Sequence, residues 1–224
     1  MPSLSINGLS VMEARIHLPR AGVWSAELAV DAAVASALEA GSQRQLTIAA
    51  QGQSLVFAGT VFRSDSYAQN ATLRLVGGAH GMTKICKPRF YSNSPILNPV
   101  DDILQDAGET LAASADQNSL GVSLPFWTLV AQPAGQALTN LADQVGAVWR
   151  TLPDGSVFFG EDGFQASALT QYELIDYRPL DGLQTIASEL PDVFPGELFN
   201  GFKVSSVEHV VNDRGSRARL WFET

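Results

Sequence analysis

Two stretches of the chain, about 140 residues apart, share one pattern of strands and glycine. Residues 55–67 read LVFAGTVFRSDSY and residues 198–211 read LFNGFKVSSVEHVV. In each stretch a Phe-x-Gly sequence, Phe57 to Gly59 or Phe199 to Gly201, precedes an alternating apolar run, a polar turn and a second alternating run. Such alternation is typical of half-buried strands. The pattern therefore predicts the same kind of β-hairpin near both ends of the chain.

The first hairpin belongs to a longer run of strand patterns. A short alanine-rich helix, capped by Asp31 and ended by Gly41, is expected to interrupt this run. Gly52 marks a turn and Gly59 a bulge. Residues 1–90 are predicted to form a first antiparallel β-barrel domain. Strands are expected at residues 4–18, 23–30, 46–50, 55–63 and 71–76.

A different pattern occupies residues 91–166, which are predicted to form a small α/β insert with two helices and a β-hairpin. Residues 84–99, with three prolines, are interpreted as a connector. Asn98 is expected to cap the first helix, whose apolar residues follow helical spacing up to Leu111. The second helix is expected at residues 133–145, with Gly146 at its end, followed by a hairpin around an Asp-Gly turn at 153–156.

Strand patterns return in residues 167–224, which are predicted to form a second β-barrel region. The expected strands are residues 172–177, 183–187, 198–211 and 217–222. The fold class that follows is mainly β (α+β), with two antiparallel β-barrels separated by the α/β insert.

Composition excludes several classes of protein. The chain is 46% hydrophobic and 17% charged, as globular proteins are, and its start reads as no secretory leader. Cys86 is the only cysteine, so no internal disulfide forms. A net charge of −9 argues against a sequence-independent grip on phosphate backbones. Solubility is the simplest reason for this acidity.

No catalytic motif stands out, and we predict no catalytic residue, metal site or cofactor. His80 and His209 are interpreted as structural. The adjacent acids Asp101 and Asp102 are assigned to a helix start, where the helix dipole favours negative charge. Glu161 and Asp162 are interpreted as a solvated pair in a turn, although two carboxylates could in principle serve a glycosidase. The sequence thus gives no reason to predict an enzyme.

Four stretches resemble the baseplate hub proteins of bacteriophage tails, including those of Mu-like phages, and the related hub of the type VI secretion spike. They are PVDDILQDAGE (99–109), QALTNLADQVGAVWRTLPDGSVFFGE (136–161), DVFPGELFNGFKVSSVEHVV (192–211) and RARLWFE (217–223). Family members of the contractile kind often run longer, and this sequence stops just after the last stretch. The resemblance lies in the order of structural patterns.

The resemblance implies a homotrimer at the tail tip, with two tail-tube-like barrels per chain that continue the six-fold tail tube and surround a DNA channel. The implied partners are a tail tube or distal tail protein, a spike or fibre protein, and the tape measure protein. DNA would pass without specific binding, and acidic walls would ease its passage. The implied location is the tail tip of the virion, after assembly in the cytoplasm of the bacterial host.

Six residues are candidates for structural or assembly roles within this family resemblance. Trp149 and Trp221, like Phe57 and Trp24, are expected in barrel or hairpin cores. Gly59 and Gly201 are expected at bends where a Cβ would be poorly tolerated. The full set of candidates is Phe57, Gly59, Trp149, Phe199, Gly201 and Trp221.

Two alternatives stay open. The first is a carbohydrate- or cell-wall-binding β-sandwich module, or a hydrolase, which would behave as a monomer and expose aromatic side chains such as Trp127 and Phe158 in a groove. The second is a hub or spike component of a phage-like secretion device, which would share the fold and differ in its neighbours.

Overall fold

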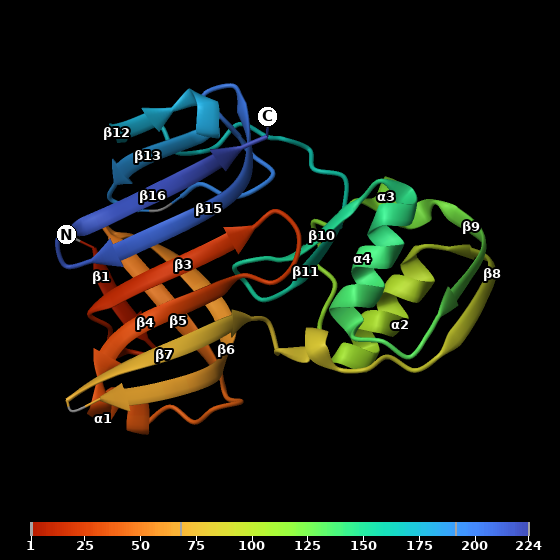
Figure 1. Cartoon of the computed structure of the whole chain (residues 1–224), viewed down its shortest axis with the longest axis horizontal. Helices are drawn as coiled ribbons and strands as arrows, with labels where there is room; N and C mark the ends of the chain where they lie inside the picture. Colours follow the sequence, from red (N-terminus) through yellow and green to blue (C-terminus); the bar gives the residue numbers. More distant parts are fainter. Residues whose placement is uncertain (1, 68, 191, 224) are drawn as a thin grey trace.

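One antiparallel sheet of twelve strands contains both ends of the chain in the computed structural model, which describes residues 2–67, 69–190 and 192–223 (Figure 1). Along this sheet the order is β12-β13-β16-β15-β3-β4-β7-β6-β5-β1-β2, and β14 pairs with β15. The strands are β1 (Ser3–Ile6), β2 (Leu9–Ser10), β3 (Glu13–Pro19), β4 (Ser25–Asp31), β5 (Gln43–Ala50), β6 (Gln53–Tyr67), β7 (Asn70–Gly77), β12 (Glu173–Arg178), β13 (Leu183–Ser188), β14 (Leu198–Phe199), β15 (Phe202–Asn212) and β16 (Gly215–Phe222).

The pairing of β3 with β15 joins the two groups of strands that lie far apart in sequence. Its register runs from Ser206 opposite Pro19 to Asn212 opposite Glu13. The mainly-β class is thus confirmed, while the strands assigned to two barrels share one sheet. Their division into two barrel domains stays a prediction.

Alternation along the strands builds one core under this sheet. On β3 and β4 every second side chain is buried, as Ile16 and Leu28 illustrate. Side chains from the other end of the chain, including Val207, belong to the same hydrophobic cluster. Trp24 and Phe57 meet edge to face in it, with ring centroids 5.5 Å apart. Burial of both ends in one cluster ties them into a single folding unit.

Residues between the two sheet segments form an insert with its own core, which projects to one side of the sheet (Figure 1). Helices α2 and α4 pack against each other, and the hairpin of β10 and β11 follows α4 as predicted. The two-stranded ribbon of β8 and β9 covers the far side of the helices (Figure 1). The elements are β8 (Arg89–Pro95), α2 (Leu97–Ala107), α3 (Gln117–Gly121), β9 (Ser123–Leu129), α4 (Ala134–Val145), β10 (Val148–Thr151) and β11 (Val157–Gly160), with single 3-10 turns at Gly81–Thr83 and Pro179–Asp181.

Three local predictions need correction. Helix α1 (Ala32–Ser36) is shorter than expected, and the side chain of Asp31 makes no capping hydrogen bond. The proline-rich connector contains strand β8. Its prolines lie outside the strand or at its end, where the lack of a proline N–H removes no hydrogen bond between the paired strands. Helix α2 begins at Leu97, so Asn98 lies inside it and donates to Ser94 Oγ instead of capping.

The two similar hairpins are only partly equivalent. Both β6–β7 and β15–β16 contain a register shift shortly after the Phe-x-Gly sequence, at Val61/Arg63 and Val204/Ser206. However, Gly59 lies inside β6, opposite Gly77, whereas Gly201 forms the turn between β14 and β15. The matched glycines therefore occupy different places in the two hairpins, and the bulge expected at Gly59 falls a few residues later.

Candidate assembly surfaces and the junction of the two cores

Backbone hydrogen bonds dock the β10–β11 hairpin of the insert onto the sheet. Gly22, in the turn between β3 and β4, donates its N–H to Trp149 O at 2.8 Å and accepts from Thr151 N at 3.0 Å. The indole Nε1 of Trp24 donates to Leu152 O at 2.9 Å. Ala58 on β6 donates to the carbonyl of residue 153 at 2.7 Å. Backbone bonds of this kind fix the orientation of the insert relative to the sheet.

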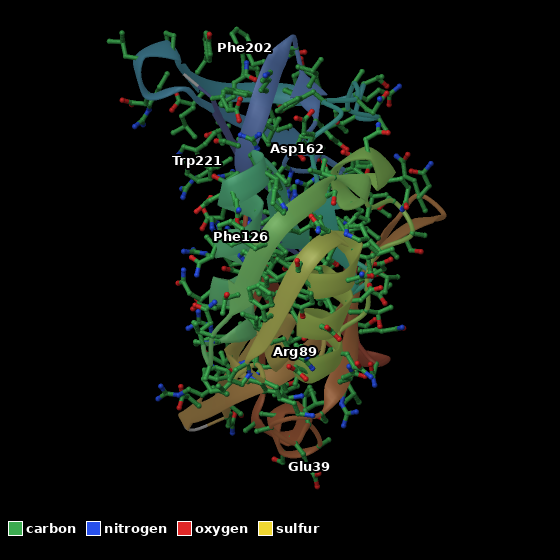
Figure 2. All side chains as sticks on the ribbon, turned by 90° about the vertical axis from the view of Figure 1, so that its right-hand side faces the viewer. Glu39, Arg89, Phe126, Asp162, Phe202 and Trp221 are labelled. Atoms are coloured by element: carbon green, nitrogen blue, oxygen red, sulfur yellow. The ribbon has the colours of Figure 1, made fainter. Side chains whose placement is uncertain are left out.

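A buried ion cluster reinforces the same junction, and it corrects the prediction that Asp162 is solvated. The Asp162 side chain has no exposed surface and accepts from Arg150 Nη1 at 2.5 Å and from Arg20 Nε at 2.6 Å. Arg20 also pairs with Glu223, just beyond β16. One carboxylate thus connects the β3–β4 turn, the insert and, through Arg20, the end of the chain. Figure 2 shows Asp162 near the level where the insert meets the upper strands.

The chain that leaves this cluster is held by aromatic and cationic side chains. Phe164 adopts a left-handed backbone conformation, with φ of 42°, which is rare for a bulky residue. Its ring lies 4.2 Å from Lys203 Nζ and 5.4 Å from the guanidinium carbon of Arg20. These cation–π contacts hold the ring of Phe164 in place, and they offset part of the cost of its left-handed backbone conformation.

A cleft of about 530 Å³ opens beside the junction, between the sheet and the insert. The aromatic side chains on its walls are engaged with the protein itself: Phe158 is stacked under Arg150, 4.5 Å from its guanidinium carbon, and Trp24 is fully buried. Trp127, the other aromatic named for a carbohydrate groove, is also buried. Among the described residues, Trp127 thus lies in the core of the insert, and Phe158 is buried at the wall of the cleft beneath Arg150.

Strand β12, at one end of the sheet, is exposed on both faces. Successive residues Leu174 and Ile175 are 50% and 47% exposed, and Tyr177 and Leu180 nearby are exposed as well. Within the described part of the chain only β13 pairs with this strand, and a register shift occurs at Leu174/Asp176. A sheet edge with exposed apolar residues is a template for pairing with another chain. We call Leu174, Ile175, Tyr177 and Leu180 the edge patch.

The β8–β9 ribbon presents a second apolar surface at the far end of the insert. Phe90 and Phe126, on adjacent strands, are 67% and 70% exposed, and Figure 2 shows Phe126 on this outer surface. The inner side of the ribbon is anchored to α2, because Arg89 forms a two-pronged ion pair with Asp106 at 2.6 and 3.0 Å. This hydrogen-bonded pair lowers the pKa of Asp106 to about 2. Anchoring of this kind holds the aromatic face outward.

Four of the six candidate residues, Phe57, Gly59, Trp149 and Phe199, are buried. Phe57 and Phe199 lie in the core of the sheet, and Trp149 lies in the core of the insert, where its Nε1 donates to Thr139 Oγ1 at 2.9 Å. Trp221 was expected in a core but is only half buried, because it lies on the outward-facing side of β16 between the buried Leu220 and Phe222. Whether these residues act in assembly stays a prediction.

The two candidate glycines are restricted for different reasons. A Cβ at Gly59 would lie 2.7 Å from Val76 O and 2.8 Å from the Trp24 ring, so there is no space for it. Gly201 has open space around it but a φ of 81°, which a residue with a Cβ adopts only at a cost. Gly201 is also exposed, so its bend lies at the surface.

The described residues contain no group of three or more His, Cys, Asp or Glu side chains placed to hold a metal ion. His209 is completely buried, with Nε2 3.2 Å from Val193 O, and burial lowers its pKa to about 4. Asp101 and Asp102 lie within α2 rather than in its first turn, and Tyr91 donates to Asp102 at 2.7 Å. None of the helices described here has the length and apolar character needed to cross a bilayer.

Comparison with solved structures relates this arrangement to a known fold. The 43 kDa tail protein of prophage MuSo2 from Shewanella oneidensis superposes with a TM-score of 0.67 and 12% identity, over 98% of this chain and 96% of that one. A tail protein from Neisseria meningitidis MC58 gives a TM-score of 0.67 and 13% identity, over 98% and 95%. The chain has the fold of phage tail proteins.

The same fold occurs in a secretion system. The E. coli c3393 protein, a component of the type VI secretion system with structural similarity to the T4 tail proteins gp27 and gp5, superposes with a TM-score of 0.63 and 11% identity, over 99% of this chain and 77% of that one. No protein-family model and no curated protein matches the sequence. The similarity to these proteins therefore lies in the fold, and comparison of sequences does not detect it.

Proposed function

We propose that this protein is a structural baseplate hub of a phage tail. In this role three chains form a ring that joins the six-fold tail tube to the three-fold tail tip or spike, and the ring surrounds the DNA channel. The observation that carries the proposal is the sheet of twelve strands, in which two strand groups from opposite ends of the chain are joined through β3 and β15, in a fold shared with phage tail proteins.

The two strand groups support a match between a ring of three chains and a six-fold tail tube. Each contains a long hairpin with a register shift, β6–β7 or β15–β16, and the two hairpins belong to one sheet. Three chains with two comparable strand groups each would present six units to a six-fold tube. Closed cyclic assemblies are the common form of homo-oligomers.

The edge patch supports self-association. A strand end with unpaired backbone groups and exposed Leu174 and Ile175 is an aggregation hazard unless another strand covers it. In a ring, the edge of each copy would be covered by the next copy. A lone binding module gains nothing from such an edge.

Native mass spectrometry over a range of concentrations tests the proposal. The chain has a mass of 23.9 kDa, so a trimer would appear at about 72 kDa. Electron microscopy of the same sample would then show rings with a central opening. A monomer at all concentrations, together with binding of cell-wall oligosaccharides, would contradict the proposal in favour of a carbohydrate-binding module.

A hub in a phage-like secretion device is the second candidate, because the E. coli type VI secretion component shares the fold. The two hubs would form the same ring and differ in what lies above and below it. Affinity purification from cells that express the neighbouring genes separates them: a tape measure or distal tail protein favours the phage tail, and a secreted effector favours the secretion device.

A further inference from the structure

We propose that a row of arginines across the outward face of the sheet contacts the phosphate backbone of double-stranded DNA. The row consists of Arg217 on β16, Arg15 on β3, Arg74 on β7 and Arg63 on β6, and we call it the arginine row. The choice of DNA among polyanions rests on the proposed function, in which DNA passes through the ring.

Strand register places these side chains in one line. Arg217 lies opposite Val210, Val210 opposite Arg15, Arg15 opposite Glu27, Glu27 opposite Arg74, and Arg74 opposite Arg63. All four arginines are exposed, while the residues on either side of each along β16, β3 and β7 are buried. The row crosses six strands, which corresponds to about 24 Å at about 4.8 Å per strand spacing. Figure 1 shows β16, β15, β3, β4 and β7 side by side across this line.

The charge of the row departs from that of the whole chain. It holds four arginines and one glutamate, in a protein whose net charge is −9. Among the described residues, Arg74 and Arg217 have no carboxylate within 4.0 Å, whereas Arg63 pairs with Asp65 and Arg15 lies 3.8 Å from Glu208. Two guanidinium groups are thus free to bind an anion. The arginine row is therefore an exception to the acidity that was expected of the channel wall.

The pairing of Arg63 with Arg74 is unfavourable for the sheet itself. Like charges directly opposite each other on neighbouring strands destabilise the pair, and an acidic residue at either position would stabilise it. Acidic side chains are available on the same face at Asp65 and Glu13, one row away. The arrangement is better explained by an anionic partner than by the needs of the fold.

Duplex DNA fits the row by length and charge. A segment of duplex about 24 Å long carries about 14 phosphates, which is more than enough to meet four guanidinium groups. Contacts to phosphate do not depend on sequence, so they suit DNA that slides past. The acidic residues in the flanking rows, Glu13 and Glu208, keep the interaction weak enough for passage.

Fluorescence anisotropy with a labelled 20-base-pair duplex at low salt tests the inference. Contact with about four phosphates predicts a slope of about −3.6 for log K against log salt, and loss of two contacts predicts about −1.8. Arg74→Glu with Arg217→Glu should weaken binding by about tenfold or more. The control, Arg178→Glu with Lys87→Glu, makes the same change in net charge on the edge strand and on the insert, and should change binding by less than about twofold.

Each result decides the matter. Equal losses in the two double variants would show that only net charge matters and would overturn the inference, as would binding of polyglutamate in place of DNA. If the glutamate pair fails to fold by circular dichroism, Arg74→Gln with Arg217→Gln gives the same test. Native mass is measured in parallel, because a monomer that binds DNA through the row refutes the hub, whereas a trimer that ignores DNA refutes only the row.

Discussion

The carboxylate of Asp162 is fully buried and lies 2.5 Å from the guanidinium of Arg150. Asp162 follows the last strand of the insert, and Arg150 lies on β10 of the same hairpin, whereas the second contact, to Arg20 in the β3–β4 turn, is formed only when the insert and the sheet are docked. A buried charge is tolerated when its partners are in place and is costly without them. The junction of the two cores is therefore a point where small changes have large effects.

Removal of this charge should destabilise the protein strongly. Asp162→Asn leaves the shape almost unchanged but leaves Arg150 without its anion and Arg20 with Glu223 alone, so we expect the free energy of unfolding to fall by about 3–5 kcal/mol. Urea denaturation followed by circular dichroism measures the change. Asp176→Asn is the control, because its exposed pair with Arg178 should contribute less than about 1 kcal/mol. Equal effects of the two changes would contradict a buried cluster.

The two candidate glycines should respond differently to alanine. Gly59→Ala forces its Cβ against Val76 O and the ring of Trp24, so β6 or β7 must shift, at a cost of about 2–3 kcal/mol. Gly201→Ala meets no neighbour and costs about 1–2 kcal/mol through its positive φ alone. Gly201→Asn should recover most of that loss, since asparagine tolerates this conformation, whereas Gly59→Asn should not. Thermal melting of the four variants tests the order.

Periodic local patterns allowed much of the fold to be predicted. The helix ending at Gly146 and the hairpin after it are fixed by spacing and turn residues, and the structure has both. Sequence neighbours say nothing about which distant strands pair, so the pairing of β3 with β15, which joins the two strand groups in one sheet, could not be predicted. Local patterns also do not show the partners of Asp162, because these lie 12 and 142 residues away along the chain.

One missed feature did leave a signal. Leu174 and Ile175 are adjacent apolar residues in a strand that otherwise alternates, and adjacent apolar residues in a strand point to opposite faces. A strand with apolar groups on both faces is either buried on both faces or has an exposed apolar face that another chain can cover. The prolines around β8, in contrast, argued against a strand, although prolines at strand ends and on free edges are compatible with one.

Acid should destabilise the protein through His209. Its pKa is about 4 in the folded state against 6.5 for the free side chain, because burial disfavours the charged ring. Between pH 6.5 and 4 the unfolded chain binds a proton that the folded chain does not, so stability falls by about 3 kcal/mol over this range and is fully present above it. Urea denaturation at a series of pH values measures the slope.

His209→Leu serves as the comparison for this slope, since it removes the titrating group at a buried position. The difference in slope between the two proteins isolates His209 from other groups. Asp106, whose pKa is lowered to about 2, acts only below its ordinary value of 3.8, where its contribution is lost as pH falls. The same slope in wild type and His209→Leu would contradict the assignment.

The edge patch should be required for the ring. Leu174→Lys with Ile175→Lys places two charges on the exposed strand β12, and lysine on an edge strand prevents pairing with another chain. Both side chains are about half exposed in the single chain, so the fold should remain, with a change in the free energy of unfolding within about 1 kcal/mol. Native mass spectrometry should then show 23.9 kDa in place of about 72 kDa.

Phe90→Lys with Phe126→Lys, on the ribbon at the far end of the insert, is the matched control and should leave the trimer intact. A trimer that survives the changes in β12 and is lost with those in the ribbon would move the contact between copies to the insert.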